Sequence, residues 1–131
     1  MIRSCLYIDL TANRGRGVFT SQDIDAATVI EVSPVIVLNA AERILLDQTA
    51  LHDYIFLWGE TAQECCVGLG FLSLYNHNDQ SNSEYEMNFL TSTMQIKTMR
   101  KIKKGEEVFI NYNGDWDNAK PVWFEQKPDL K

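Results

Sequence analysis

Short apolar runs, rich in β-branched side chains and separated by turn-forming residues, constrain the fold of this chain most strongly. Between residues 28 and 38 alone, six positions are valine or isoleucine. Branching at Cβ favours strands over helices. The segments 84–90 and 94–99 alternate between apolar and polar side chains, and 108–112 is a further apolar run, so each of them predicts a strand.

One segment favours a helix instead. Asn39 is suited to an N-cap, Glu42 follows at the position of a capping box, and 44–46 supplies apolar side chains. The segment 54–58 fits either a buried strand or a helical turn. The sequence therefore predicts a mainly β fold of many short strands with little helix.

Length and charge limit the organisation and the partners of the chain. Its 131 residues, 45% of them hydrophobic, fit a single domain over 1–131, with a core at about 4–116 and an aromatic C-terminal segment at 117–131. The net charge is −6, and a nucleic-acid-binding surface needs the opposite sign. We therefore expect no direct nucleic-acid binding. The acid surplus suits a basic protein or peptide, or serves solubility alone.

Cysteine usage and hydropathy indicate an intracellular protein. The cysteines are Cys5, Cys65 and Cys66, an odd number with two adjacent, which does not form a disulfide framework. The sequence has no Cys-x-x-Cys pair, so we expect no structural zinc. No stretch approaches the roughly 18 apolar residues that a membrane-spanning helix needs, so we expect no membrane span.

Two motifs in the first two thirds of the chain are candidates for ligand binding. Gly15-Arg16-Gly17 is a loop between two predicted strands, and it fits a tight hairpin as well as a loop that lets the backbone approach a ligand. Asn76-His77 follows an apolar segment, and a buried amide there can satisfy two donors and one acceptor. We interpret His77 first as a hydrogen-bonded structural residue; a base, or a metal ligand together with His52 and a cysteine, are the alternatives.

Tyr112 ends the last predicted strand. It is either a packing residue or a hydroxyl that the strand fixes and directs at a reacting centre. Beyond it lie Trp116, Trp123 and Phe124. Leaving such rings in water forfeits roughly 1.5–3 kcal/mol each, so we expect this segment to pack on the domain.

The three motifs together resemble the signature blocks of SET-domain lysine methyltransferases. The segment 15–19 is similar to the glycine-flanked opening motif, and 76–82 to the Asn-His-Ser-Cys-x-Pro-Asn stretch. Gly-Glu-Glu-Val at 105–108, leading to Tyr112, resembles the block that precedes the catalytic tyrosine. Asp53-Tyr54 and 68–71 are also similar to the very small members encoded by large algal viruses and some bacteria.

The resemblance implies a role for each motif. The backbone of Gly15, Arg16 and Gly17 would contact the methionine part of S-adenosylmethionine. Asn76 would hold the α-amino group of the cofactor, and the main chain of His77 would meet its adenine edge.

Aromatic residues would complete the site. Tyr112 would stand beside the sulfonium methyl group as the catalytic residue. Trp116 would cover the cofactor, and Trp123, Phe124 and Tyr54 would wall a lysine channel. The implied fold is the SET arrangement (β-clip-like) of short curved sheets with a C-terminal pseudoknot.

Two substitutions depart from the family pattern. Asn78 stands where the family has serine, and Ser81 stands where it has proline, which leaves the path of this loop open. The cysteine-rich flanking regions of many histone enzymes are absent from the sequence, so aromatic residues near the C-terminus must close the site.

The resemblance implies methyl transfer from S-adenosylmethionine to a lysine of a basic protein, histone or histone-like, in the cytoplasm or the nucleus. Such a reaction needs a neutral amine held in line with the methyl group, and neither a metal nor a nucleophilic side chain. A SET-derived peptide-binding module without activity is the alternative, and a small β-rich structural protein with chance motif matches is a third. The smallest members of the family often pair, so a homodimer is compatible with the resemblance.

Overall fold

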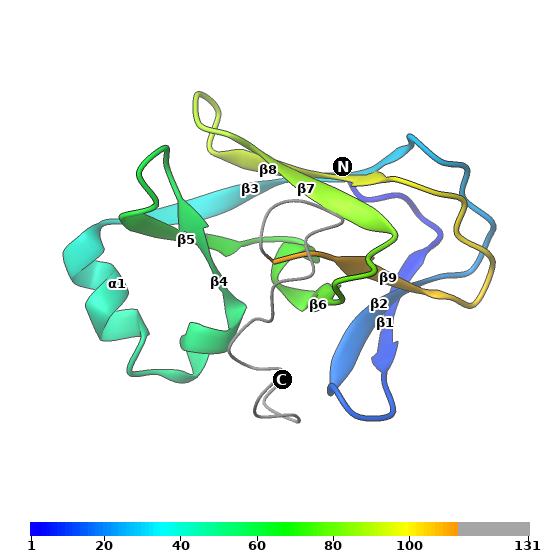
Figure 1. Ribbon diagram of the computed structural model, residues 1–131, viewed down its shortest axis with the longest axis horizontal. Helices are drawn as coiled ribbons and strands as arrows, with labels where there is room; N and C mark the ends of the chain where they lie inside the picture. Colours follow the sequence, from blue (N-terminus) through cyan, green and yellow to red (C-terminus); the bar gives the residue numbers. More distant parts are fainter. Residues whose placement is uncertain (113–131) are drawn as a thin grey trace.

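The computed structural model describes residues 1–112. They fold into two twisted sheets (Figure 1). The first sheet has the order β1-β2-β9-β6 and the second the order β4-β5-β3-β8-β7. The strands are β1 (Leu6–Leu10), β2 (Arg16–Thr20), β3 (Val29–Leu38), β4 (Ile55–Trp58), β5 (Glu64–Gly68), β6 (Asn76–His77), β7 (Ser83–Asn88), β8 (Thr93–Thr98) and β9 (Glu107–Ile110). One α-helix, α1 (Ala40–Leu46), and two 3₁₀ helices, η1 (Ala50–Tyr54) and η2 (Leu72–Leu74), complete the described elements. The mainly β prediction is confirmed.

Strand β8 shows why the alternating segments fold as predicted. Met94, Ile96 and Thr98 are fully buried, and the residues between them are partly exposed. This period of two gives the strand one face toward the core. On the neighbouring strand β7, Tyr85 lies opposite Ile96 and packs against the same core.

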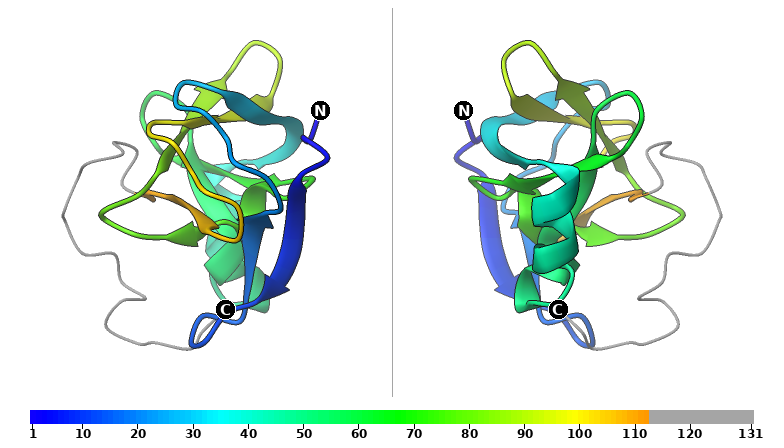
Figure 2. Two further views of the ribbon diagram at one scale, coloured as in Figure 1. Left: turned by 90° about the vertical axis from the view of Figure 1, so that its right-hand side faces the viewer. Right: turned by 90° about the vertical axis from the view of Figure 1, so that its left-hand side faces the viewer.

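Helix α1 begins where the capping box predicts. The Asn39 side chain accepts a hydrogen bond from the Glu42 amide at 2.8 Å, and the Glu42 carboxylate accepts one from the Asn39 amide at 3.0 Å. Such reciprocal capping offsets the short length of the helix. No residue of α1 is buried, and Ile44 and Leu45 are exposed. The helix lies at one end of the molecule, with the β1–β2 hairpin toward the other (Figures 1 and 2).

The ambiguous segment 54–58 contains both structures that the sequence allowed. Tyr54 is the last residue of η1, and the following four residues form β4. Phe56 and Trp58 are buried, whereas Leu57 is half exposed. Strand β4 therefore has one face in the core and pairs with β5 along its whole length.

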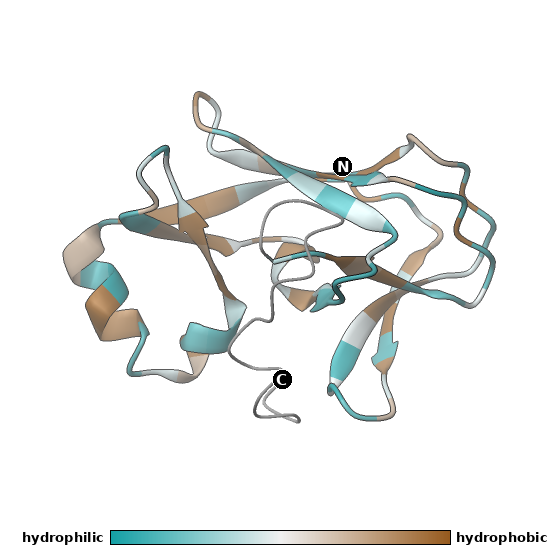
Figure 3. Ribbon diagram, in the orientation of Figure 1, coloured by the Kyte–Doolittle hydropathy of each residue, from teal (hydrophilic) through white to brown (hydrophobic). Residues whose placement is uncertain are grey.

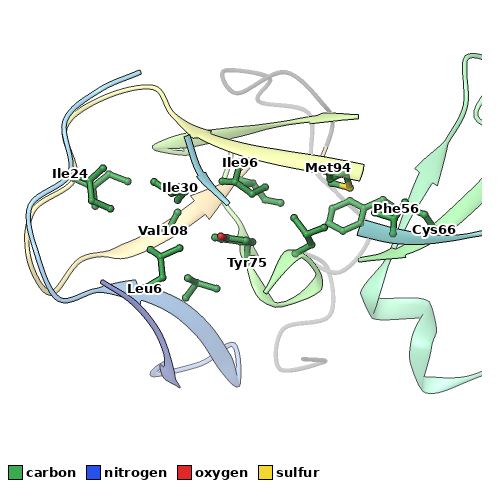
Figure 4. Close-up of a cluster of buried hydrophobic side chains, with 14 of the residues drawn as sticks. Leu6, Ile24, Ile30, Phe56, Cys66, Tyr75, Met94, Ile96 and Val108 are labelled. Atoms are coloured by element: carbon green, nitrogen blue, oxygen red, sulfur yellow. The ribbon is translucent and has the colours of Figure 1, made fainter. Parts of the chain in front are cut away.

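A single core fills the space between the two sheets. Hydrophobic residues concentrate along β3 and β5 (Figure 3). Side chains from both sheets meet around Tyr75, which is fully buried at the centre of the cluster (Figure 4). Each large apolar side chain buried there contributes about 1.5–3 kcal/mol.

The described residues form no helix that is long and apolar enough to cross a membrane.

The three cysteines are buried and free. Burial raises the pKa of the Cys66 thiol to about 12, and the neighbouring Cys65 contributes to this rise. A thiol with so high a pKa is a poor nucleophile at neutral pH. Cys66 therefore acts as a small apolar side chain in the core.

Strand β9 joins segments that are far apart in the sequence. It pairs antiparallel with β2 and parallel with β6, where Asn76 lies opposite Phe109 and His77 opposite Ile110. Asn82 strengthens this junction, because its side chain donates to the Glu107 carbonyl at 2.9 Å and accepts from the Phe109 amide at 2.9 Å. The C-terminal pseudoknot implied by the resemblance lies outside the described residues.

Candidate active site

Tyr112 is held by groups from three different segments. Its hydroxyl donates a hydrogen bond to the main-chain carbonyl of Tyr75, and its amide donates to Nδ1 of His77 at 3.0 Å. Its ring packs edge-on against Phe56, with 5.7 Å between the centroids, and against His77, with 5.4 Å. These contacts fix the position of the Tyr112 phenol relative to β6.

The surroundings of Tyr112 keep its hydroxyl protonated. Burial raises the pKa of this phenol far above its ordinary value, and the guanidinium of Arg14 opposes the shift only in part. The phenols of Tyr85 and Tyr54 raise the pKa further. A neutral hydroxyl has one proton and two acceptor lone pairs. Since the proton goes to the Tyr75 carbonyl, any further hydrogen bond of this oxygen is one that it accepts.

Asn76 carries a buried acceptor atom that has no hydrogen-bond partner among residues 1–112. Its Nδ2 donates to the Arg16 carbonyl at 3.1 Å and to Oε2 of Glu107 at 2.8 Å. Both of these partners are acceptors, so they fix which end of the amide is nitrogen. Its Oδ1 is buried and has no partner within the described part of the chain. An unsatisfied buried carbonyl costs about 1–3 kcal/mol, and a ligand N–H group would remove this cost.

Gly17 lies against the same amide. A Cβ atom at this position would come within 2.9 Å of Nδ2 of Asn76 and still closer to Oε2 of Glu107. Only glycine lets the strand approach these two groups. Gly15 has φ of 65°, a left-handed conformation that glycine adopts without strain.

We expect Gly17→Ala to lower stability and to weaken ligand binding at Asn76 together. The added methyl group must displace the Asn76 amide or the Glu107 carboxylate, and such overpacking costs about 1–3 kcal/mol. Thermal denaturation and calorimetric titration with S-adenosylmethionine would measure the two effects. Gly105→Ala is the control, because Gly105 has φ of 86° and a Cβ atom there would meet nothing within 4 Å. It should reduce stability alone, and an equal loss of affinity in both variants would contradict the steric explanation.

The side chain of His77 joins two segments of the site. Because Nδ1 accepts from the Tyr112 amide, a neutral ring carries its proton on Nε2. The His77 carbonyl accepts from Nη1 of Arg14 at 2.9 Å, which ties the loop before β2 to β6. Both contacts are structural. The contact of its main chain with a ligand stays a prediction.

The structure brings together most of the residues that the sequence singled out. Gly15 lies in the turn between β1 and β2, whereas Arg16 and Gly17, predicted as part of the loop, are the first residues of β2. Arg16 and Gly17 lie beside Asn76, and His77 lies beside Tyr112. Tyr54 ends η1 directly before β4, the strand whose Phe56 packs against Tyr112. Trp116, Trp123 and Phe124 lie outside the described residues.

Three further residues belong to the site and were not singled out by the sequence. Glu107 entered the sequence analysis only as part of the Gly-Glu-Glu-Val block, yet its carboxylate holds the Asn76 amide. Tyr85 packs on Phe56 at 5.4 Å, and its hydroxyl donates to the Tyr112 carbonyl at 3.3 Å. Arg14 contacts His77. Strand alternation in β7 and β9 is a signal for Tyr85 and Glu107, whereas nothing in the sequence indicates Arg14.

No group of three or more histidine, cysteine, aspartate or glutamate side chains in residues 1–112 is arranged to hold a metal ion. The site that the structure does assemble consists of a neutral phenol, an amide with an unpaired oxygen and glycine backbone. Such a site can bind a ligand that carries an amino group and can orient a second group beside the phenol.

The chain is similar to known proteins over most of its length. Residues 15–113 match the family model described as the SET domain. A histone-lysine N-methyltransferase of Schizosaccharomyces pombe (strain 972), named as specific for lysine 37 of histone H3, is 37% identical over 128 residues. That match covers 97% of this chain and 82% of the yeast protein.

Solved structures agree with this similarity. A Plasmodium falciparum protein, titled a candidate histone methyltransferase, superposes with a TM-score of 0.65 at 28% identity, over 85% of this chain and 99% of that one. A humanised Chaetomium thermophilum Polycomb Repressive Complex 2, bound to an inhibitor, superposes with a TM-score of 0.72 at 17% identity, over 90% of this chain and 16% of that one. This likeness concerns the fold alone. With the family match over residues 15–113 and the motifs gathered at one site, this chain belongs to the SET-domain family.

Proposed function

We propose that this chain transfers a methyl group from S-adenosylmethionine to the side-chain amine of a lysine in a histone or a similarly basic protein. The observation that carries the proposal is the placement of Tyr112. Its neutral hydroxyl donates to the Tyr75 carbonyl and its amide donates to His77, so Tyr112 is joined to β6. The same strand holds Asn76, whose Oδ1 has no partner within residues 1–112. Membership of the SET-domain family and the similarity to a histone-lysine methyltransferase support it.

The residues present fit S-adenosylmethionine. Oδ1 of Asn76 is a buried acceptor of the kind that an α-amino group requires. The backbone at Gly15, Arg16 and Gly17 lies next to it, without side chains on the two glycines. The main chain of His77 and the ring of Trp116 are the further contacts that we propose. The cofactor supplies an electrophilic methyl group on a cationic sulfur.

Tyr112 would orient the amine that attacks this methyl group. Its proton is donated to the Tyr75 carbonyl, so toward a substrate it presents lone pairs that accept an amine N–H or stabilise a polarised methyl group. Phe56 on β4 packs against Tyr112 and would supply one aromatic wall, and Tyr54, which directly precedes β4, would supply another. Aromatic walls and a nearby cation both lower the pKa of a lysine amine from about 10.4. This favours the neutral form that reacts.

The rate of methyl transfer should increase with pH above neutrality. The neutral fraction of the lysine amine grows with pH, and Tyr112 stays protonated because burial raises its pKa. We therefore expect the single-turnover rate to increase from about pH 7 to about pH 9 and then to level, without a falling limb from this phenol. Rapid-quench measurements with labelled cofactor would test this. A falling limb that disappears in Tyr112→Phe would contradict it.

The substrate and the compartment follow from charge and similarity. A net charge of −6 suits a lysine-rich tail. A histone substrate implies the nucleus, and another basic protein is compatible with the cytoplasm. A homodimer stays a prediction, to be measured by light scattering.

The test of the proposed function is direct methyl transfer. The full chain is incubated with methyl-labelled S-adenosylmethionine and core histones, and mass spectrometry locates the modified lysine. A histone H3 peptide with arginine at the modified position is the matched control. Cofactor binding without transfer to any basic protein would favour the inactive peptide-binding module. No binding at millimolar cofactor would overturn the enzyme assignment.

A further inference from the structure

We propose that Glu31, on β3, is a positioning residue for methyl transfer and acts through Tyr75 on the Tyr112 hydroxyl. This inference rests on the proposed function. Glu31 has a buried carboxylate that takes part neither in the proposed binding of the cofactor nor in the proposed lysine channel.

The conformation of β3 turns Glu31 into the protein. The pairing of β3 with β8 shifts register between Val29 and Glu31, which is a β-bulge. A bulge lets consecutive side chains leave the ordinary alternation, and Ile30 and Glu31 are both fully buried. The chain thus bends in order to place a carboxylate in its core.

The Glu31 carboxylate accepts three hydrogen bonds there. The Tyr75 hydroxyl donates to Oε1 at 2.6 Å, while the Ser33 hydroxyl at 2.7 Å and the Phe71 amide at 2.9 Å donate to Oε2. Hydrogen bonds to a carboxylate are stronger than those between neutral groups. The carboxylate therefore ties β3 to the segment that leads into η2 and to the centre of the core.

Tyr75 carries this attachment into the site. Its side chain is bound to Glu31, its main-chain carbonyl accepts the Tyr112 hydroxyl, and the next residue in the chain is Asn76. Burial raises the pKa of Tyr75, and the charge of Glu31 raises it further, so the phenol stays a donor. The Glu31 carboxylate thereby holds Tyr75 in place. The main-chain carbonyl of Tyr75 in turn orients the hydroxyl proton of Tyr112.

The space around the carboxylate is closed. Gly70 has φ of 59°, and a Cβ there would come within 2.6 Å of Oγ of Ser33 and closer still to Oε2 of Glu31. The network therefore has little room for an alternative geometry. Well-packed apolar residues often stabilise a core as well as buried charged groups do, so stability alone does not account for a carboxylate at this position. Its connection to Tyr112 is the feature that a packing role does not explain.

Tyr75→Phe is the decisive variant, and Ser33→Ala is its matched control. Each removes one hydroxyl that donates to the same carboxylate, but only Tyr75 continues to Tyr112. We expect Tyr75→Phe to lower the single-turnover rate at saturating cofactor and peptide about tenfold, with the Kd of S-adenosylmethionine changed less than about twofold. Ser33→Ala should keep the wild-type rate within about twofold. Equal rate losses in both variants would overturn the proposal.

Combination with Tyr112→Phe tests the route of the effect. If Tyr75 acts through the Tyr112 hydroxyl, Tyr75→Phe should cause no further loss of rate in the Tyr112→Phe background, because the group that it positions is gone. Additive losses would mean a structural role and would overturn the proposal. If Tyr75→Phe does not fold, Glu31→Gln is the second variant: it keeps an acceptor for Tyr75 but removes the charge that strengthens this hydrogen bond. Its loss of rate should be smaller than that expected for Tyr75→Phe and should also vanish in the Tyr112→Phe background, and additive losses would again overturn the proposal. An inactive wild type would count against the proposed function, and an active wild type with an unaffected Tyr75→Phe would count against the positioning role alone.

Discussion

Replacing Tyr112 with phenylalanine should lower methyl transfer by about 10²-fold or more while the protein stays folded. The variant keeps the ring that packs on Phe56 and His77 and loses only the hydroxyl. Loss of one preorganised polar group at a reacting centre costs about 10²–10³ in turnover. The amide of Tyr112 still donates to His77, so β6 and the end of β9 keep their junction.

The affinity for S-adenosylmethionine separates catalysis from binding in this variant. We expect the Kd by calorimetry to change less than about twofold, because Asn76 and the loop of Gly15 and Gly17 are untouched. Tyr7→Phe is the matched control: it removes a hydroxyl from a partly exposed ring that stacks on Phe19. It should keep the wild-type rate. A Tyr112→Phe variant with normal turnover would show that Tyr112 only packs.

The strands of this fold could be predicted because their patterns are local. Alternation predicts the buried face of β8, and the capping box at Asn39 predicts the start of α1. The order of the strands could not be predicted, since pairing joins residues with no local signal. The parallel pairing of Asn76 with Phe109 is an example.

The site was predictable to the extent that a family motif marks it. Asn76 and Tyr112 lie in such motifs. Glu107 also lies in one, but only the fold shows that its carboxylate contacts Asn76. Glu31 lies in a run of valine and isoleucine, where the bulge that buries it has no sequence signal. Residues that support a site from another strand are therefore the ones that sequence reasoning misses.

Asn76→Ala should weaken binding of S-adenosylmethionine about 10- to 100-fold. The variant removes the one acceptor that we propose for the α-amino group, and a hydrogen bond to a charged group contributes about 1.5–3 kcal/mol. It also leaves the Arg16 carbonyl and the Glu107 carboxylate without their 3.1 and 2.8 Å donor. Turnover at saturating cofactor should fall much less than the affinity, the reverse of the result for Tyr112→Phe. Calorimetric titration measures the first quantity and single-turnover kinetics the second.

The control for this variant is an asparagine whose hydrogen bonds lie elsewhere. Oδ1 of Asn88 accepts from the amides of Leu90 and Thr91 at 3.1 and 3.2 Å in the exposed β7–β8 turn. Asn88→Ala therefore loses local hydrogen bonds without touching the site, and its Kd for the cofactor should equal that of the wild type. Analogues of S-adenosylmethionine without the amino group give the complementary test. If Oδ1 of Asn76 binds the amino group, these analogues should bind wild type and Asn76→Ala with equal affinity. An analogue without the amino group cannot make this hydrogen bond, so removing Oδ1 costs it nothing further. A preference of such an analogue for wild type over Asn76→Ala would assign the effect of the substitution to the displaced Glu107 and Arg16 instead.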